Sequence, residues 1–469
     1  MAGEYPNCAA AELRVIGNLA PFAACGTTAR ATRSTIDRAK SPVFWLRPAS
    51  GTAFLRRNGS QGAQRMRAGI LPHADLPHII PNFRLARSLL KLGCDVRILG
   101  SDVVKIGKGH SEAWSSSVEK FKFGESLALH NSADETFLSW LERQIDSFQL
   151  DIVILDAVWQ SLAYALPGKI AVHHAGLPDF RSEDMPTWLF VHPKHGKERW
   201  KSARSRLDAL ESSGRGVRAL FYHVGKLTGL TLDSKPFDFG CGEFAKIPAV
   251  RSMCLPRELE FPKEAGRVAY LGTNLPSETD VDWTAPPEQL IRNDRPLILC
   301  IFGTTGLTDS SEYRWLLSTA TTLANSFADH IVAAVIPGIN QSDSQRLTAD
   351  VKNLSLYSWI PLWETLSMRQ APTVLVTTPG VGALREAAAA GTPIVAIPRR
   401  LDQFGAAARI EYFGLGRCLV SQDLPDATSV AANVARCLGD KPIRARCFEF
   451  KQKISSHKGL QSLQRFLES

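Results

Sequence analysis

A glycine-rich turn between an apolar strand and a helix is the first feature of the sequence whose residue types suit ligand chemistry. The turn has the sequence PGVGA, at residues 379–383. Backbone N–H groups around Gly380, Gly382 and Ala383 would lie at the positive end of the helix, where they could hold a diphosphate. Glycines also open many helices only to let them pack against a sheet, so the motif alone leaves both interpretations open.

Four other side chains near this turn have the chemistry to bind a sugar, a ribose or a base. Asp402 and Gln403 stand side by side after the strand PIVAIP, so they could hold adjacent hydroxyls of a pyranose or simply cap a helix. Glu386, one turn into the helix, could accept hydrogen bonds from a ribose or lie on a solvated helix face. Trp359 could stack on a nucleobase or pack in the core.

The elements that would position these residues alternate between apolar strands and amphipathic helices from residue 67, and the pattern restarts near Pro296. Such alternation predicts parallel sheets that are covered on both faces. We therefore expect an α/β fold with two facing Rossmann-like domains and a ligand cleft between them, at the carboxyl ends of the strands. The predicted parts are an extension (1–65), a first domain (66–278), a linker (279–295), a second domain (296–440) and C-terminal helices (441–469).

The composition argues against several other classes of protein. No apolar run approaches the roughly 18–20 residues of a membrane-spanning helix, which predicts a soluble chain. The nine cysteines are scattered and form no C-x-x-C pair, which argues against a disulfide framework and favours a reducing, cytoplasmic setting. Residues 1–65 hold nine Lys and Arg but three acidic residues, so six of the nine net charges lie there, and the rest of the chain calls for no nucleic-acid partner. This segment reads either as a dispensable, disordered extension ahead of Met66 or as a transit peptide.

The order and spacing of the motifs resemble those of the family-1, UDP-glycosyltransferase-like GT-B enzymes of bacterial natural-product type. Their signature runs roughly W-x-P-Q, then H-x-G-x-[GN]-[ST]-x-x-E, then G-x-P-x-x-x-x-P-x-x-x-D-Q. The matching segments here are residues 359–362, 378–386 and 391–403, and the resemblance extends from about residue 67 to 440. Thr378 replaces the signature histidine, Ala383 replaces the Ser/Thr, and Leu362 replaces the Gln.

The resemblance implies a role for each matched residue. Trp359 would stack on the base, Glu386 would bind the ribose, and Asp402 with Gln403 would hold the sugar hydroxyls. Amides around Gly380 to Ala383 would hold the diphosphate, beside Gly303 and Thr304. The replacements at Thr378 and Ala383 weaken or remove two phosphate contacts, although the Thr378 hydroxyl could still donate one hydrogen bond.

The first domain would supply the acid–base chemistry of the resembled enzymes. Their H-x-x-P motif is matched by His78-Ile79-Ile80-Pro81, whereas His73 has the wrong spacing. An imidazole can take the proton of an attacking hydroxyl, and a carboxylate behind it stabilises the imidazolium. The resemblance gives that carboxylate role to Asp156, at the end of the strand LDIVILD. Attack opposite the leaving diphosphate would invert the anomeric centre, without a metal and without a cofactor beyond the nucleotide-sugar co-substrate.

The sequence therefore predicts an inverting glycosyltransferase that moves a hexose from a UDP- or dTDP-sugar to a hydroxyl of a small lipophilic acceptor. The acid–amide pair favours a glucose-like sugar, as in UDP-glucose. A non-catalytic nucleotide-sugar-binding helper protein is one alternative, because of Thr378 and Ala383. An enzyme for lipid-linked acceptors at a membrane surface is another, because residues 192–206 form a basic run. The acceptor loops are expected at residues 102–131 and 178–215. His173 and His174 could line the acceptor pocket or be structural.

Overall fold

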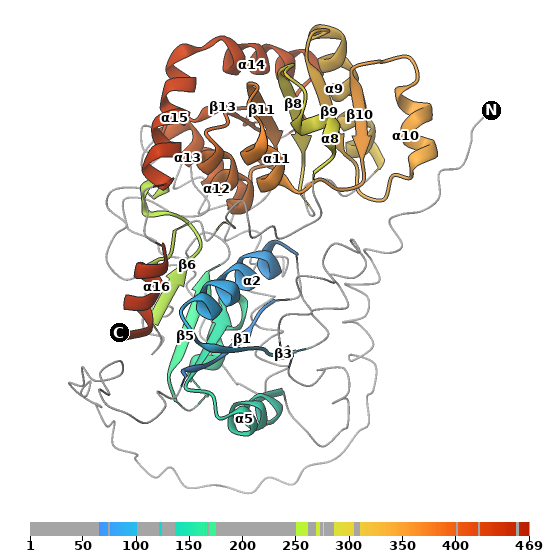
Figure 1. Ribbon diagram of the computed structural model, residues 1–469. Coiled ribbons are helices and arrows are strands. Elements are labelled where there is room, and N and C mark those ends of the chain that lie inside the picture. The colour runs from blue at the N-terminus through green and yellow to red at the C-terminus, as the bar shows by residue number, and fades with distance from the viewer. Residues whose placement is uncertain are drawn as a thin grey trace, which may run out of the picture. The chain divides into compact units, whose positions relative to one another are not determined.

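The computed structural model describes residues 65–73, 76–100, 122–123, 137–164, 166, 168–174, 250–260, 269–272, 275, 286–303, 310–399, 402–420, 423–455 and 459–468 (Figure 1). Several sequence predictions lie outside these residues. They concern the extension up to residue 64, Thr304, the basic run at 192–206, the acceptor loop at 178–215 and most of the loop at 102–131.

The first sheet consists, within the described residues, of seven parallel strands in the order β3-β2-β1-β4-β5-β6-β7. Their bounds are β1 (Arg67–Leu71), β2 (Asp95–Ile98), β3 (Lys122–Phe123), β4 (Ile152–Asp156), β5 (Ile170–His174), β6 (Val250–Met253) and β7 (Ala269–Tyr270). The accompanying helices are α2 (Leu76–Lys91), α5 (Phe137–Phe148) and the 3₁₀ helices η3 (Ala157–Tyr164) and η6 (Arg257–Leu259). All five residues of β4 are buried, as expected for a central strand covered on both faces.

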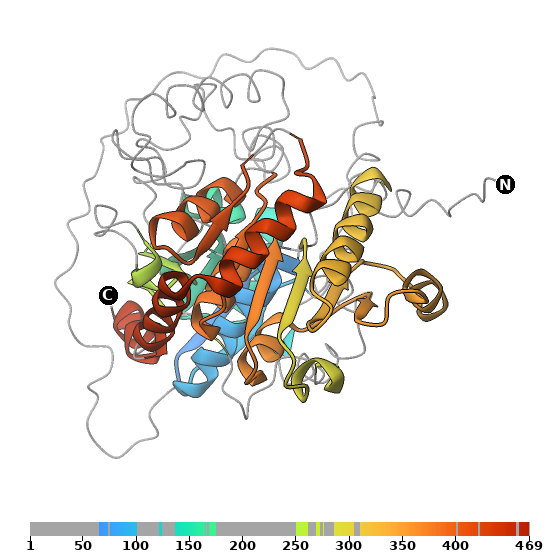
Figure 2. The same cartoon turned by 90° about the horizontal axis from the view of Figure 1, so that it is seen from above.

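The second sheet has six parallel strands among the described residues, in the order β10-β9-β8-β11-β12-β13 (Figures 1 and 2). These strands are β8 (Leu297–Ile301), β9 (Ile331–Val335), β10 (Leu354–Tyr357), β11 (Thr373–Thr377), β12 (Ile394–Ala396) and β13 (Gly416–Cys418). The helices in this part of the sequence are α8 (Glu288–Ile291), α9 (Ser310–Ser326), α10 (Gln341–Thr348), α11 (Leu362–Met368), α12 (Val381–Ala390), α13 (Asp402–Tyr412), α14 (Ala427–Gly439) and α15 (Lys441–Ser455), followed by α16 (Gly459–Glu468), which packs on the first sheet.

Both sheets follow the same strand order, and this order locates the functional residues. In each sheet the first three strands lie side by side, with the first strand innermost. The fourth strand then pairs with the other edge of the first strand, and the later strands continue outward from it. The reversal therefore falls between β1 and β4 in the first sheet and between β8 and β11 in the second. Ligands of such sheets bind beyond the carboxyl ends of the strands at this reversal. The predicted α/β class with two parallel, Rossmann-like sheets is confirmed.

Glycines determine where helix α12, which follows the predicted diphosphate-binding turn, begins and ends. It begins after Gly380, whose extended backbone carries no side chain to cap the helix, and it ends at Gly391. Gly391 has φ +75°, a left-handed conformation, and its N–H donates to the carbonyls of Ala387 and Ala388. A Cβ there would lie 3.2 Å from the side chain of Lys451 in α15, so glycine suits this position on both counts.

Helix α16 belongs to the core of the first sheet, although it follows α15 in sequence. Leu463, Phe466 and Leu467 are buried together with residues of α2, β1, β2 and β4. The Nζ atom of Lys169, just before β5, donates to the carbonyl of Leu467 at 2.6 Å. Within the described part of the chain, no helix is both long and apolar enough to cross a bilayer.

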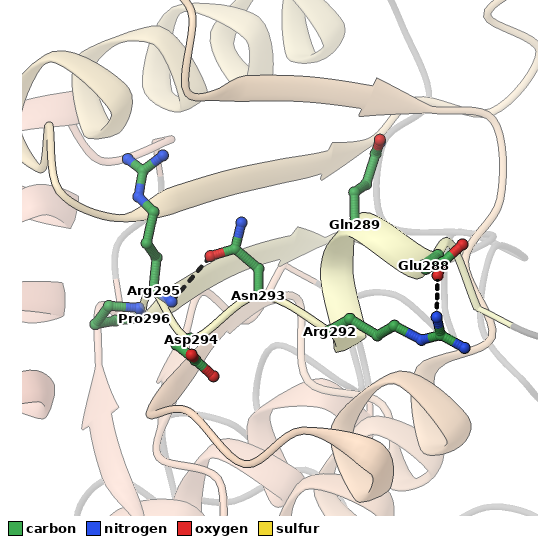
Figure 3. A pocket seen from close by; sticks show the side chains of 7 residues that line it. All are labelled: Glu288, Gln289, Arg292, Asn293, Asp294, Arg295 and Pro296. Atoms are coloured by element: carbon green, nitrogen blue, oxygen red, sulfur yellow. Dashed lines mark hydrogen bonds and ion pairs between the residues drawn. The ribbon is translucent and has the colours of Figure 1, made fainter.

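The predicted linker contains a short helix that the sequence analysis did not foresee. Helix α8 is anchored by Leu290, which is buried. An open hollow of about 870 Å³ lies beside it and is lined by Glu288, Gln289, Arg292, Asn293, Asp294, Arg295 and Pro296 (Figure 3). Glu288 pairs with Arg292 inside this hollow, and the Asn293 side-chain oxygen accepts from the Arg295 N–H at 3.0 Å. No predicted site residue lines it, so it is not the expected ligand site.

Candidate active site

His78 and Asp156 meet at the strand reversal of the first sheet. Helix α2 begins at Leu76, so His78 lies in its first turn rather than ahead of the helix. Its Nδ1 atom lies 3.0 Å from Oδ1 and 3.1 Å from Oδ2 of Asp156, the last residue of β4. A carboxylate only accepts hydrogen bonds, so the neutral imidazole donates Nδ1–H and carries its lone pair on Nε2. Asp156 is completely buried, while His78 is partly exposed.

Asn82, one turn further along α2, was not identified from the sequence. Its Nδ2 atom donates to Oδ2 of Asp156 at 2.7 Å and to the backbone carbonyl of His78 at 2.8 Å. Only its spacing of four residues from His78 hinted at a shared helix face. The 74 residues between Asn82 and Asp156 hid the second contact from sequence reasoning.

His173 is adjacent to Asp156 in the register of β4 and β5, but it lies inside the core. Its Nδ1 atom lies 3.0 Å from the Ser252 hydroxyl of β6. Burial lowers the pKa of His173 from its ordinary 6.5 to about 4; the negative charge of Asp156 opposes this shift, and Arg385 and His78 reinforce it. A neutral, buried imidazole fits a structural role for His173 better than a place in the lining of an acceptor pocket. The side chain of His174 lies outside the described part of the structure.

His73 and Trp159 lie beside His78. The His73 ring packs edge-on to the His78 ring at a centroid distance of 5.3 Å, and it lies 6.1 Å from the Trp159 ring. The Trp159 indole N–H donates to the carbonyl of Pro72 at 3.2 Å, which ties η3 to the segment after β1. The imidazole that reaches Asp156 is therefore that of His78, with an aromatic wall next to it.

The strand reversal of the second sheet brings Gly303 and Thr378 together. Gly303 follows β8 with φ +66°, and a Cβ placed there would lie 4.0 Å from the Thr378 hydroxyl. Thr378 follows β11 and is buried. Its hydroxyl donates to the carbonyl of Phe302 at 2.7 Å. The proton of the Thr378 hydroxyl binds a backbone oxygen here, and its donation to a phosphate stays a prediction.

The N-terminus of α12 has the features of an anion site. Its Ncap residue, Gly380, makes no side-chain capping hydrogen bond, so the first backbone N–H groups of the helix have no side-chain acceptor from that residue. A Cβ built at Gly380 or Gly382 would meet no heavy atom within 4 Å, so the backbone is open to a close approach. Ala383, at the third helical position, is half-buried and adds no polar group.

Glu386 is held by two arginines rather than being a solvated helix residue. Its Oε1 atom accepts from Arg84 Nη1 of α2 at 2.6 Å and lies 3.4 Å from Arg385 Nη2. Arg385 is itself buried and reaches the carbonyl of Cys254, just beyond β6, at 3.5 Å. Neither arginine was identified from the sequence. A ribose at Glu386 would share the carboxylate with these two guanidinium groups.

Of the remaining predicted donor residues, Trp359 follows β10, whereas Asp402 and Gln403 open α13 after β12. Gln403 is buried in the first turn of α13, and its side-chain oxygen accepts from the backbone N–H of Arg399 at 2.8 Å. Asp402 opens α13, and its side chain lies outside the described part. Trp359 is half-buried and packs against the core cluster that contains Ile70 and Ile79. Within the described residues, no three His, Cys, Asp or Glu side chains gather as a metal site.

Comparisons with known proteins found sequence similarity over parts of the chain. Residues 321–462 match the family model described as the C-terminal domain of erythromycin biosynthesis protein CIII-like proteins. The oleandomycin glycosyltransferase of Streptomyces antibioticus is 32% identical over 94 residues, which is 20% of this chain and 21% of that protein. The zeaxanthin glucosyltransferase of Pseudescherichia vulneris is 35% identical over 86 residues, 18% of this chain and 20% of its own length. The matched stretch thus spans about a fifth of each curated relative.

Solved structures extend the likeness to nearly the whole fold. The glycosyltransferase SnogD from Streptomyces nogalater superposes with a TM-score of 0.56 at 18% identity, covering 86% of this chain and 99% of that one. The spinosyn rhamnosyltransferase SpnG complexed with thymidine diphosphate also gives 0.56, at 16% identity, with coverage of 86% and 100%. Residues 321–462 are therefore similar to the C-terminal domain of erythromycin biosynthesis protein CIII-like proteins, and the chain has the GT-B fold.

Proposed function

We propose that the chain is an inverting glycosyltransferase that moves a hexose from a UDP- or dTDP-sugar to a hydroxyl of a small lipophilic acceptor. The observation that carries this proposal is the contact between His78 and Asp156 at the strand reversal of the first sheet. A half-exposed imidazole backed by a fully buried carboxylate is suited to general-base catalysis. The relatives named above are glycosyltransferases, which supports the same reaction class.

In the proposed mechanism, Nε2 of His78 takes the proton of the acceptor hydroxyl as its oxygen attacks the anomeric carbon. The positive charge that develops on the ring is stabilised by Asp156, which also holds the tautomer in place. The bond to the diphosphate breaks on the opposite face, which inverts the configuration. Backbone N–H groups of the first turn of α12 stabilise the leaving diphosphate. We infer that the nucleotide sugar is a co-substrate and that no further cofactor takes part.

A second candidate is a non-catalytic nucleotide-sugar-binding helper protein. One observation favours it: the Thr378 hydroxyl binds the Phe302 carbonyl, and Ala383 adds no polar group at the helix start. Few side chains are thus left to donate hydrogen bonds to the diphosphate. Each such bond to a charged group contributes roughly 1.5–3 kcal/mol, so their loss weakens the binding of the donor. The amides of α12 would then carry most of the binding.

The test begins with thermal unfolding of the full chain in the presence of UDP, dTDP and their hexose conjugates. A ligand that binds the folded state raises the melting temperature by mass action. Product formation from the donor that binds is then measured with a panel of lipophilic alcohols and phenols. Transfer that falls by about 10²–10⁴-fold in His78→Ala, with nucleotide binding unchanged, supports the enzyme. Nucleotide binding without transfer to any acceptor supports the helper protein.

A further inference from the structure

The side-chain amide of Asn82 donates both of its hydrogens to the proton-transfer pair, by which we mean His78 and Asp156. The residue is completely buried in α2. Its Nδ2 atom lies 2.7 Å from Oδ2 of Asp156 and 2.8 Å from the His78 carbonyl oxygen. Both partners are acceptors, so the nitrogen, and not the oxygen, of the amide must face them. The orientation of the side chain is thus fixed by chemistry.

The other end of the same amide shows which contacts decide its position. The Oδ1 atom of Asn82 is buried and accepts no hydrogen bond within the described residues. Leaving a buried acceptor without a partner is unfavourable. The two hydrogen bonds donated by Nδ2 therefore determine the orientation of the side chain, even though its oxygen has no partner.

The backbone around His78 gives this contact a second effect. Pro81 lies inside α2 and has no N–H, so the first turn of the helix lacks one of its backbone hydrogen bonds. The bond from Asn82 to the His78 carbonyl adds a tie within that turn. Asn82 thus fixes the backbone of the histidine and the carboxylate of the aspartate with a single group.

We propose that Asn82 is a positioning residue of the proton-transfer pair, holding the Asp156 carboxylate against Nδ1 of His78 so that Nε2 faces the acceptor. The effect of Asn82 on catalysis rests on the proposed function. Its effect on the tautomer and titration of His78 can be measured whether or not the protein transfers sugar. Donation by Asn82 stabilises the ionised form of Asp156. Without it, the carboxylate and the ring together bind a proton more tightly, and the ring is less firmly held.

The experiment follows the ring of His78 directly, by NMR of the full chain labelled with ¹⁵N-histidine, with the signals assigned through His78→Gln. Asn82→Leu removes both donors at similar size, and Asn82→Ser keeps a shorter side chain with one hydroxyl donor. We expect the pH midpoint of the His78 titration to rise by about one pH unit in Asn82→Leu and by less in Asn82→Ser. The Nδ1–H tautomer is expected to lose its dominance in Asn82→Leu.

Asn433→Leu is the matched control. Asn433 donates from Nδ2 to the carbonyl of Ser429, four residues earlier in α14, at 2.8 Å, and its side chain reaches no carboxylate. Asn433→Leu therefore measures the effect of losing only the bond from an asparagine side chain to the carbonyl four residues earlier in its helix. The other charged or titratable groups around the pair, His73, His173 and Arg385, are unchanged in every variant.

The outcomes separate this inference from the proposed function. If the tautomer and the midpoint of His78 in both Asn82 variants equal those of the wild type and of Asn433→Leu, Asn82 is not a positioning residue, whether or not the protein transfers sugar. If they shift while the wild type shows no transfer, the inference stands and the proposed reaction fails. Should Asn82→Leu not fold, Asn82→Ser decides alone. For an active wild type, kcat is expected to fall more than KM changes, and the effect of Asn82→Ser is expected to vanish in an Asp156→Asn background.

Discussion

Arg84 Nη1 lies 2.6 Å from Glu386 Oε1, although 302 residues separate the two in sequence. The contact joins α2, which carries His78, to α12, whose N-terminus is the candidate diphosphate site. Only 3% of the Arg84 side chain and 10% of the Glu386 side chain is exposed. Charges removed from water to this extent are tolerated only with a partner, so each of these residues depends on the other.

Glu386→Gln is expected to lower the free energy of unfolding by about 3–5 kcal/mol, because it leaves the guanidinium groups of Arg84 and Arg385 facing a neutral amide. Urea unfolding followed by circular dichroism measures the change. Glu449→Gln is the matched control, since that carboxylate also lies between two cations, Arg446 and Lys453, but in water. We expect no measurable change there. Equal losses in the two variants would show that burial of the first pair has no energetic effect.

Thr378→Val is expected to reduce stability by about 1 kcal/mol and to leave the Kd for a nucleoside diphosphate unchanged, because the hydroxyl already donates to the Phe302 carbonyl. Isothermal titration calorimetry gives the Kd, and thermal unfolding gives the stability. Thr365→Val serves as the control, since its hydroxyl makes the same kind of buried bond to the Pro361 carbonyl at 2.7 Å. A Kd about tenfold weaker in Thr378→Val alone, or about 1.4 kcal/mol, would mean that the hydroxyl turns to the phosphate after all.

Ala383→Asp separates helix stability from anion binding at the start of α12. A carboxylate in the first turn interacts favourably with the helix dipole, which is expected to stabilise the fold by about 0.3–1 kcal/mol. The same charge repels a diphosphate, so we expect nucleotide affinity to fall at least tenfold, to an extent that lessens with added salt. Thr428→Asp, in the first turn of α14, carries the same charge at another helix start and is expected to leave affinity unchanged. Unaltered affinity in Ala383→Asp would place the diphosphate elsewhere.

The buried His173 predicts how stability depends on pH. Its pKa is about 4 in the folded protein, because burial disfavours the charged ring, against an ordinary value of 6.5. Between these values the unfolded chain binds a proton that the folded chain does not, so stability is intact above about pH 6.5 and is lost as the pH falls toward 4. The loss is expected to approach about 1.4 kcal/mol for each pH unit in this window.

Urea unfolding at a series of pH values, in the wild type and in His173→Gln, isolates this contribution. Glutamine does not titrate, so the variant should show a shallower decline between pH 6.5 and 4. Parallel curves for the two proteins would indicate that carboxylates elsewhere account for the acid sensitivity.

Much of the architecture was predictable from periodicity, because each strand and helix is encoded by its own residues. The uninterrupted apolar runs of β4 and β11 and the glycine after α12 determine their elements locally. Periodicity also predicted strands that end at Asp156 and just before Thr378, whereas the roles of these two residues were implied by the family resemblance. Helix α2 contains Pro81 in its interior, a residue that more often marks a helix boundary.

What the sequence did not reveal are side-chain contacts between segments far apart in the chain. Asn82, Arg84 and Arg385 were not singled out from the sequence, because only the folded chain brings Asp156 and Glu386 to them. The contact of the Thr378 hydroxyl with the Phe302 carbonyl was hidden for the same reason, since 76 residues separate the two. Propensity and spacing describe one helix or strand at a time and contain no information about such partners.

The packing of α16 has a consequence for the order of events during synthesis. Leu463, Phe466 and Leu467 complete a core whose other members come from β1, β2, β4 and α2, near the opposite end of the described chain. Translation proceeds from the N-terminus at about 5–20 residues per second, so that core must wait roughly 20–80 seconds after its first strand is made. The core of the first sheet therefore stays incomplete during synthesis, and the apolar surface that α16 covers stays open until residue 467 has been added.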